Sequence, residues 1–159
     1  MTRNVKSLAL DEGGASIIEM GLMLPVLSSL LIGFVDISRA YSAKLQLEQA
    51  AYRSIENVQQ YNASESTYDT IKTEAAAAAN SSGFSGVTTS DVTLDFWLEC
   101  NGTRQANYDT VCSTGQTYAR FLTVDISAKF NPVFASSKWP GSNTDGSYTL
   151  HGQAGLRTQ

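Results

Sequence analysis

The stretch "DEGGASIIEMGLMLP", residues 11–25, places a carboxylate, Glu19, at the start of a long apolar run. The run extends from Ile17 to Val35, and Glu19 is its only charged member. A helix of this length reaches about 28 Å, because each residue adds about 1.5 Å, and a bilayer has a hydrocarbon core of about 30 Å. The sequence therefore predicts a membrane-spanning helix that carries a charge near its beginning.

Two other interpretations of this run stay open. One is an export signal peptide, because Ser38-Arg39-Ala40 offers small residues at the spacing that signal peptidase needs. Signal peptides usually have a shorter apolar core of about 7–15 residues, however, and Glu19 would weaken insertion. The other is a buried core helix, which would normally show a polar face, and this run shows almost none. Both are weaker than a spanning helix.

Composition limits the rest of the chain to one modest globular domain. The protein has 159 residues, a net charge of -4 and a pI near 4.9. Its eleven basic residues are scattered, whereas nucleic-acid binding needs clustered Lys and Arg. We therefore expect no nucleic acid among its partners.

The two cysteines, Cys100 and Cys112, both lie in the polar part of the chain and bracket a loop rich in Asn, Gly, Thr and Asp. In an exported domain, such a pair predicts a disulfide. Two free thiols in a cytosolic domain are the alternative. A metal site is not favoured, because the chain has a single histidine.

Helical periodicity continues beyond the apolar run, so one helix is expected from Ser16 to Gln60. Pro25 lies inside it and should bend it, because proline removes a backbone hydrogen bond. A second helix is expected at about 66–80, where "EAAAAAN" joins the best helix former to an Asn stop. The long helix should pack through a stripe at steps of three and four residues: Ile37, Tyr41, Leu45, Glu48, Tyr52, Ile55 and Val58.

After "SSGFSG" the apolar pattern changes to a period of two, which is typical of half-buried strands. Loops, not helical crossovers, join these segments, which favours an antiparallel sheet. We expect an α+β fold, with the long helix covering about three strands and the cysteine loop between the first two. The expected strands are 92–99, 122–130 and 148–156.

The sequence offers little that would support catalysis. His151 is the sole histidine and falls on the polar side of the last predicted strand. Asp95 and Glu99 share a strand face, a pattern more typical of solvated surface than of acid–base catalysis. Neither a phosphate-binding loop nor a dinucleotide-binding glycine pattern is present. We therefore predict no catalytic residue, no metal ligand and no cofactor.

A glycine followed by four residues and a glutamate, at the start of a long apolar helix, resembles the processing pattern of type IV pilins. Here Gly14 precedes "ASII", and Glu19 follows. The wider block through "LP" at residues 24–25 resembles the start of TadE-like proteins, the pilin-like components of bacterial tight-adherence (Flp) pilus systems. The resemblance covers about residues 11–55, with weaker similarity in "FNPVF" and in the closing "YTLHGQAGLR".

This resemblance implies that a prepilin peptidase cuts after Gly14, so that Ala15 becomes the first residue. Glu19 would then pair with the Ala15 amine of a neighbouring subunit, since an unpaired ionised group in lipid costs a few kcal/mol. A carboxylate that merely reaches the membrane interface is the alternative. The implied organisation is a cytoplasmic leader at 1–14, a spanning helix at 15–36 and a periplasmic or extracellular α+β domain at 37–159.

The implied function is that of a minor pilin or pseudopilin, a structural protein with no catalysis of its own. It would help to assemble a tight-adherence pilus for surface attachment and biofilm formation. The partners would be the prepilin peptidase, the major and other minor pilins, the inner-membrane assembly platform and membrane lipid. The protein would cross the inner membrane once, with its C-terminal domain in the periplasm. The alternative is an envelope binding or adhesin module, either membrane-anchored or exported by a signal peptide.

Overall fold

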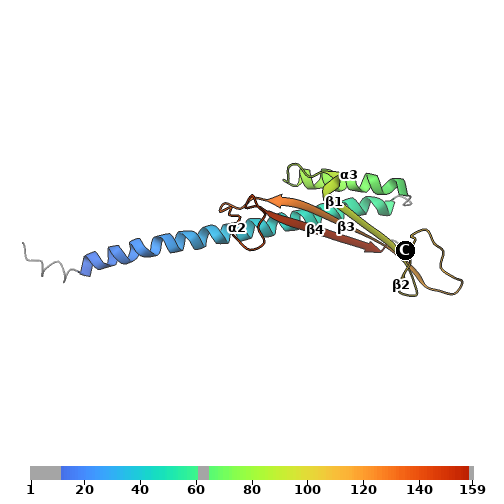
Figure 1. Ribbon diagram of the computed structural model, residues 1–159, viewed down its shortest axis with the longest axis horizontal. Helices are drawn as coiled ribbons and strands as arrows, with labels where there is room; N and C mark the ends of the chain where they lie inside the picture. Colours follow the sequence, from blue (N-terminus) through green and yellow to red (C-terminus); the bar gives the residue numbers. More distant parts are fainter. Residues whose placement is uncertain (1–11, 61–64, 158–159) are drawn as a thin grey trace, which may run out of the picture.

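The computed structural model describes the backbone of residues 12–60 and 65–157, and the side chains of residues 16–56 and 69–157. Figure 1 shows a long helix, α2, whose first half extends alone and whose second half carries the rest of the protein. The elements are α2 (Glu12–Gln60), α3 (Glu65–Ser81), a 3₁₀ turn η1 (Thr89–Asp91), β1 (Val92–Cys100), β2 (Thr103–Arg104), β3 (Tyr118–Phe130) and β4 (Tyr148–Arg157).

The predicted α+β class and the long helix on a small antiparallel sheet are confirmed. The second helix agrees with the prediction to within one residue at each end, and α2 begins four residues earlier than expected. Within α2, 49 residues form one continuous helix, about 74 Å long at about 1.5 Å per residue. Val58, the last residue of the predicted stripe, lies outside the described side chains.

The sheet has four antiparallel strands in the order β2-β1-β3-β4, so the expectation of about three was one short. The additional strand, β2, is two residues long and pairs with the end of β1. Asn101 and Gly102 form the turn between β1 and β2, with φ angles of 50° and 78°. Positive φ at two consecutive residues is typical of the tight hairpin turn that an Asn-Gly pair favours. A strand of two residues is too short to show a period of two.

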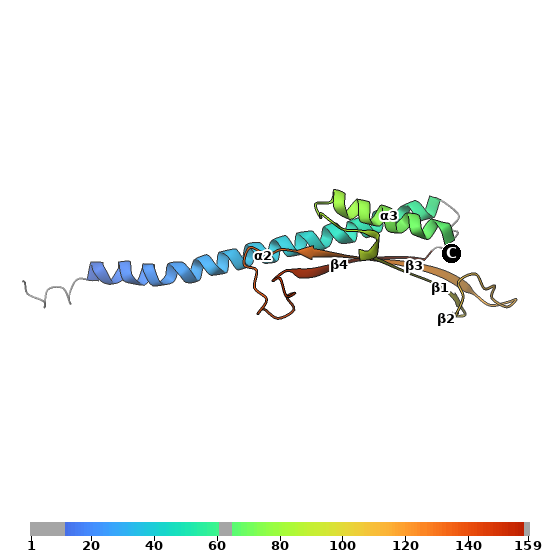
Figure 2. The ribbon, with the colours of Figure 1, turned by 45° about the horizontal axis from the view of Figure 1, so that its top comes forward.

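The core lies between one face of the sheet and the two helices. Figure 2 shows α2 and α3 on the same side of the sheet. Alternate residues of the long strands are buried there, as their period of two predicted. The central strand β3 contributes Leu122, Val124, Ile126 and Ala128.

The face of α2 that contacts the sheet differs from the predicted stripe. Ile37, Tyr41 and Tyr52 are 71%, 65% and 56% exposed, and of the stripe residues whose side chains the structure describes, only Ile55 is buried. The buried positions are instead mostly small: Leu47, Ala50, Ala51 and Ser54. The stripe prediction was therefore wrong, because it assumed that the largest apolar side chains face the core.

The physical reason is the close approach of α2 to β4 at Gly152. A Cβ atom at Gly152 would lie 2.4 Å from the backbone carbonyl carbon of Leu47 and 2.6 Å from the backbone nitrogen of Glu48. Glycine permits this because it has no side chain. This close approach favours small side chains at neighbouring positions on the same face of the helix, such as Ala50 and Ala51.

Candidate functional site

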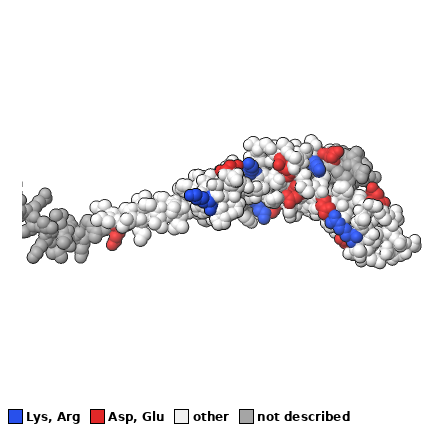
Figure 3. Space-filling view, viewed as in Figure 1, with Lys and Arg blue, Asp and Glu red and all other residues white. Residues whose placement is uncertain are grey.

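Most of the first half of α2 is an exposed apolar surface; among its described residues, only Ile32 and Gly33, near its end, are half-buried. The helix is long and apolar enough to cross a membrane, and none of its most apolar window is buried within the protein. Figure 3 shows this part as a nearly uncharged rod, whereas charged side chains gather on the rest of the molecule. The exposed large side chains are Ile17, Ile18, Met20, Leu22, Met23, Leu24, Val26, Leu27, Leu30, Leu31, Phe34 and Val35.

The polar side chains within this rod are largely satisfied by the helix itself. The Ser28 hydroxyl donates to the carbonyl of Leu24 at 2.8 Å, and the Ser29 hydroxyl donates to the carbonyl of Val26 at 2.8 Å. A hydroxyl that bonds to its own helix can lie in hydrocarbon without an unsatisfied donor. The serines therefore do not argue against membrane insertion.

Glu19 is the exception. Its side chain is exposed, and no hydrogen bond or ion pair joins it to another residue of the described chain. The bond between Gly14 and Ala15 lies in the first turn of α2, about one turn before Glu19. Pro25 lies farther along the same continuous helix. Cleavage after Gly14, pairing of Glu19 and a bend at Pro25 all stay predictions, and residues 1–11 of the leader lie outside the described chain.

The two cysteines form a disulfide at the end of the sheet farthest from the rod. Cys100 ends β1, and Cys112 lies in the following loop, with their Cα atoms 5.7 Å apart. Asn101 supports the same tip, because its side-chain oxygen accepts hydrogen bonds from the backbone N–H of Thr117 at 2.9 Å and from its hydroxyl at 3.1 Å. This tip is therefore cross-linked both covalently and by hydrogen bonds.

The polar face of the sheet carries the two carboxylates considered for acid–base chemistry, and each has another contact. Asp95 pairs with Arg104 through two hydrogen bonds, of 2.7 and 3.1 Å. Glu99 accepts a hydrogen bond of 2.8 Å from the indole nitrogen of Trp97. The pairing with Asp95 raises the pKa of Arg104 above its usual value. These contacts describe a cross-strand surface network, not a pair poised to exchange protons.

His151 lies on the same polar face, where its Nδ1 is 2.9 Å from Asp125. The Gln153 side-chain amide donates to the other oxygen of Asp125. Among the described residues, no group of three or more His, Cys, Asp or Glu side chains is placed to hold a metal ion. The network links β3 to β4.

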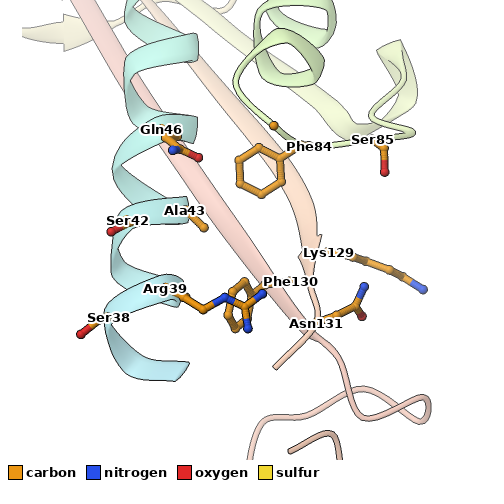
Figure 4. A pocket seen from close by; sticks show the side chains of 11 residues that line it. Ser38, Arg39, Ser42, Ala43, Gln46, Phe84, Ser85, Lys129, Phe130 and Asn131 are labelled. Carbon is orange, nitrogen blue, oxygen red and sulfur yellow. The ribbon is translucent and has the colours of Figure 1, made fainter. Parts of the chain in front are cut away.

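A cleft lies between α2, the end of β3 and the loop that follows α3. Figure 4 shows Arg39 reaching across it to Phe130, with Phe84 above and Lys129 at the side. The Arg39 guanidinium lies 5.6 Å from the centre of the Phe130 ring and 3.4 Å from Asp36. Lys129 pairs with Asp145 at 3.1 Å. Both cations already have partners, so the cleft offers no uncompensated charge for a ligand.

One contact that the sequence analysis missed joins α2 to the loop at residues 131–147, hereafter the β3–β4 loop. The Asp36 carboxylate accepts hydrogen bonds from the backbone N–H groups of Val133, at 2.9 and 3.1 Å, and Phe134, at 3.3 Å. The only available signal was an acidic residue directly after the apolar run, followed much later by the apolar "NPVF".

Comparison with known proteins finds a family that matches part of α2. The family model described as TadE-like protein matches residues 14–55, which cover the rod, Glu19 and most of the packed half of α2. No curated protein and no solved structure matches the chain significantly. The predicted resemblance is thus confirmed over the segment that carried it: residues 14–55 are similar to the TadE-like family.

Proposed function

We propose that this protein is a minor pilin or pseudopilin of a tight-adherence pilus, anchored in the inner membrane with its α+β domain in the periplasm. The observation that carries the proposal is the exposed rod of α2, which includes Glu19 and is continuous with the half that holds the domain. Such a rod has two suitable environments: lipid before assembly, and the helices of other subunits afterwards. One helix can therefore serve as membrane anchor and as assembly element.

Glu19 gives this proposal its specific chemistry. Cleavage after Gly14 would create an ammonium group at Ala15, about 6 Å from Glu19 along the helix axis. In a neighbouring subunit displaced by about one turn, the same ammonium would lie level with this carboxylate. Pairing the two would remove most of the cost of an ionised group in lipid, so the charge would set the stagger between subunits.

The processing step is tested by sequencing the N terminus of protein purified from its native membrane. We expect a start at Ala15 in cells that contain the prepilin peptidase and an uncut chain in cells that lack it. A start at Tyr41 would instead indicate a signal peptide and an exported soluble domain. An uncut chain in both strains would favour a membrane-anchored binding or adhesin module.

The assembly step is tested at Glu19. We expect Glu19→Ala and Glu19→Gln to leave export and processing intact but to reduce the pili recovered by shearing. Glu19→Asp, which keeps the charge, should retain more of them. Normal piliation with Glu19→Gln would show that the carboxylate only reaches the membrane interface and pairs with nothing.

A further inference from the structure

The β3–β4 loop is fixed beside the end of the apolar rod. Its backbone is bound by Asp36, whose side chain is only 14% exposed and lies one residue beyond the apolar run. Figure 1 shows this loop against α2, at the end of the sheet that faces the N terminus. The loop therefore holds a defined position relative to the helix.

The groove between them reaches back into the apolar run. It is lined on α2 by Ser29 and Gly33, among others, and on the loop by Phe134 and Trp139. Ser29 and Asp36 are separated by about 10 Å along the helix axis, since each residue adds about 1.5 Å. The aromatic side chains of the loop thus lie beside the last two turns before Asp36, turns that must be in or at the membrane if α2 spans it.

The loop also exposes more apolar surface than a water-facing connection needs. Val133, Phe134 and Trp139 are 60%, 56% and 58% exposed. Lys138, next to Trp139, is exposed as well. Aromatic side chains beside a lysine are typical of the interface between lipid headgroups and hydrocarbon, where rings contact acyl chains and the ammonium contacts phosphate.

We propose that the β3–β4 loop is a second membrane contact, which inserts Phe134 and Trp139 into the outer headgroup boundary of the bilayer that α2 spans. This proposal rests on the proposed function only in requiring that α2 crosses a membrane. Because Asp36 ties the loop to the helix, insertion fixes both the depth of α2 and the direction in which its domain leans. Lipid is favoured over a second subunit as the partner of the loop. Because the loop lies beside Ser29 and Gly33, a loop positioned outside the bilayer would place these two residues of the apolar run outside it as well.

The chain has two tryptophans, so each can be observed alone. The full-length protein is reconstituted into phosphatidylcholine–phosphatidylglycerol vesicles. Their lipids carry a nitroxide quencher on the acyl chain, either near the headgroup or near the bilayer centre. Trp97→Phe leaves Trp139 as the reporter of the loop. The matched control, Trp139→Phe, leaves Trp97 on the polar face of the sheet, stacked on Phe121 with ring centres 5.1 Å apart. A third variant lacks both tryptophans and carries Leu27→Trp as a reporter of the rod.

We expect the quencher near the headgroup to suppress Trp139 emission more than the quencher near the bilayer centre does. The quencher near the bilayer centre should act more strongly on the Leu27→Trp reporter. Neither quencher should affect the emission of Trp97. Quenching of the rod reporter without quenching of Trp139 would overturn this proposal and leave the anchor intact. Trp139 emission that shifts to the blue with protein concentration but resists both quenchers would replace lipid with a second subunit. If the rod reporter were also unquenched, the membrane anchor itself, and with it the proposed function, would fail.

Discussion

The two halves of α2 differ in the size of the side chains that they expose and bury. Between residues 16 and 35 the helix exposes nearly all of its large apolar side chains, including Leu30 at 65%. Between residues 36 and 56 it buries mainly alanine and serine, with Leu47 as the largest fully buried side chain. Lipid accepts any large apolar side chain, because it has no fixed shape. A sheet at close range accepts only side chains that fit.

The largest expected effect comes from making the same substitution in both halves. Leu47→Ala removes a side chain that is 0% exposed, so it should lower the free energy of unfolding by about 3 kcal/mol. Leu30→Ala should change it by less than about 0.5 kcal/mol, because the Leu30 side chain is 65% exposed. Urea unfolding of the full chain in detergent micelles measures both. Similar losses would show that the halves do not differ.

The next prediction concerns the close contact at Gly152. Gly152→Ala should destabilise the protein by about 2–3 kcal/mol, because its methyl group would overlap the backbone at Leu47. Gly155→Ala is the matched control on the same strand. Its Cβ would lie 3.3 Å from a methyl of Thr123 and 3.9 Å from the backbone oxygen of Leu122, so the effect should be below about 1 kcal/mol. If both variants unfold alike, close packing is not what selects small side chains on α2.

A smaller effect is expected where the two halves meet. Asp36→Asn keeps an acceptor for the β3–β4 loop but loses the charge, so it should cost about 1 kcal/mol. It should also speed hydrogen exchange at the amides of Val133 and Phe134, which the carboxylate now protects. Asp109→Asn, at an exposed carboxylate in the cysteine loop, is the control. Unchanged exchange at both amides would contradict the contact.

The smallest expected effect is a change of stability with pH that depends on Asp145. The hydroxyl and backbone N–H of Ser147, with the ammonium of Lys129, hold the pKa of Asp145 well below its ordinary 3.8. Since the folded pKa is the lower one, the stabilisation is complete above pH 3.8 and is lost as pH falls through the folded pKa. Near neutral pH, Asp145→Asn should therefore unfold at a lower denaturant concentration than the parent protein. The difference between the two unfolding midpoints should become smaller below pH 3.8. A difference that does not depend on pH would rule out this titration.

The regular parts of this fold could be predicted because their signals are local. Thr123, Asp125 and Ser127 alternate with buried residues on β3, and that alternation is visible in the sequence itself. The exposed rod could be predicted because its signal is a single long run of apolar residues. The TadE-like pattern was recognisable because it consists of a glycine and a glutamate at a short, fixed spacing.

The features that were missed depend on distance in space. The Asp36 carboxylate meets Val133 across 97 residues of sequence, and no local pattern marks such a pair. The packing face of α2 was misassigned because a helix with apolar residues on more than one side does not reveal which side a sheet will cover. The close approach at Gly152, on another element, is one feature that determines the packing face.

The direction of the strands has a mechanical consequence. Figure 1 shows β3 and β4 running alongside α2, from the level of the rod's end to the disulfide-linked tip. Hydrogen bonds between antiparallel strands lie perpendicular to the strands. A pull between the tip and the rod would therefore load the whole β3–β4 ladder in shear, so that its bonds resist together instead of opening one after another. Such a domain would be stiffest along the axis of α2.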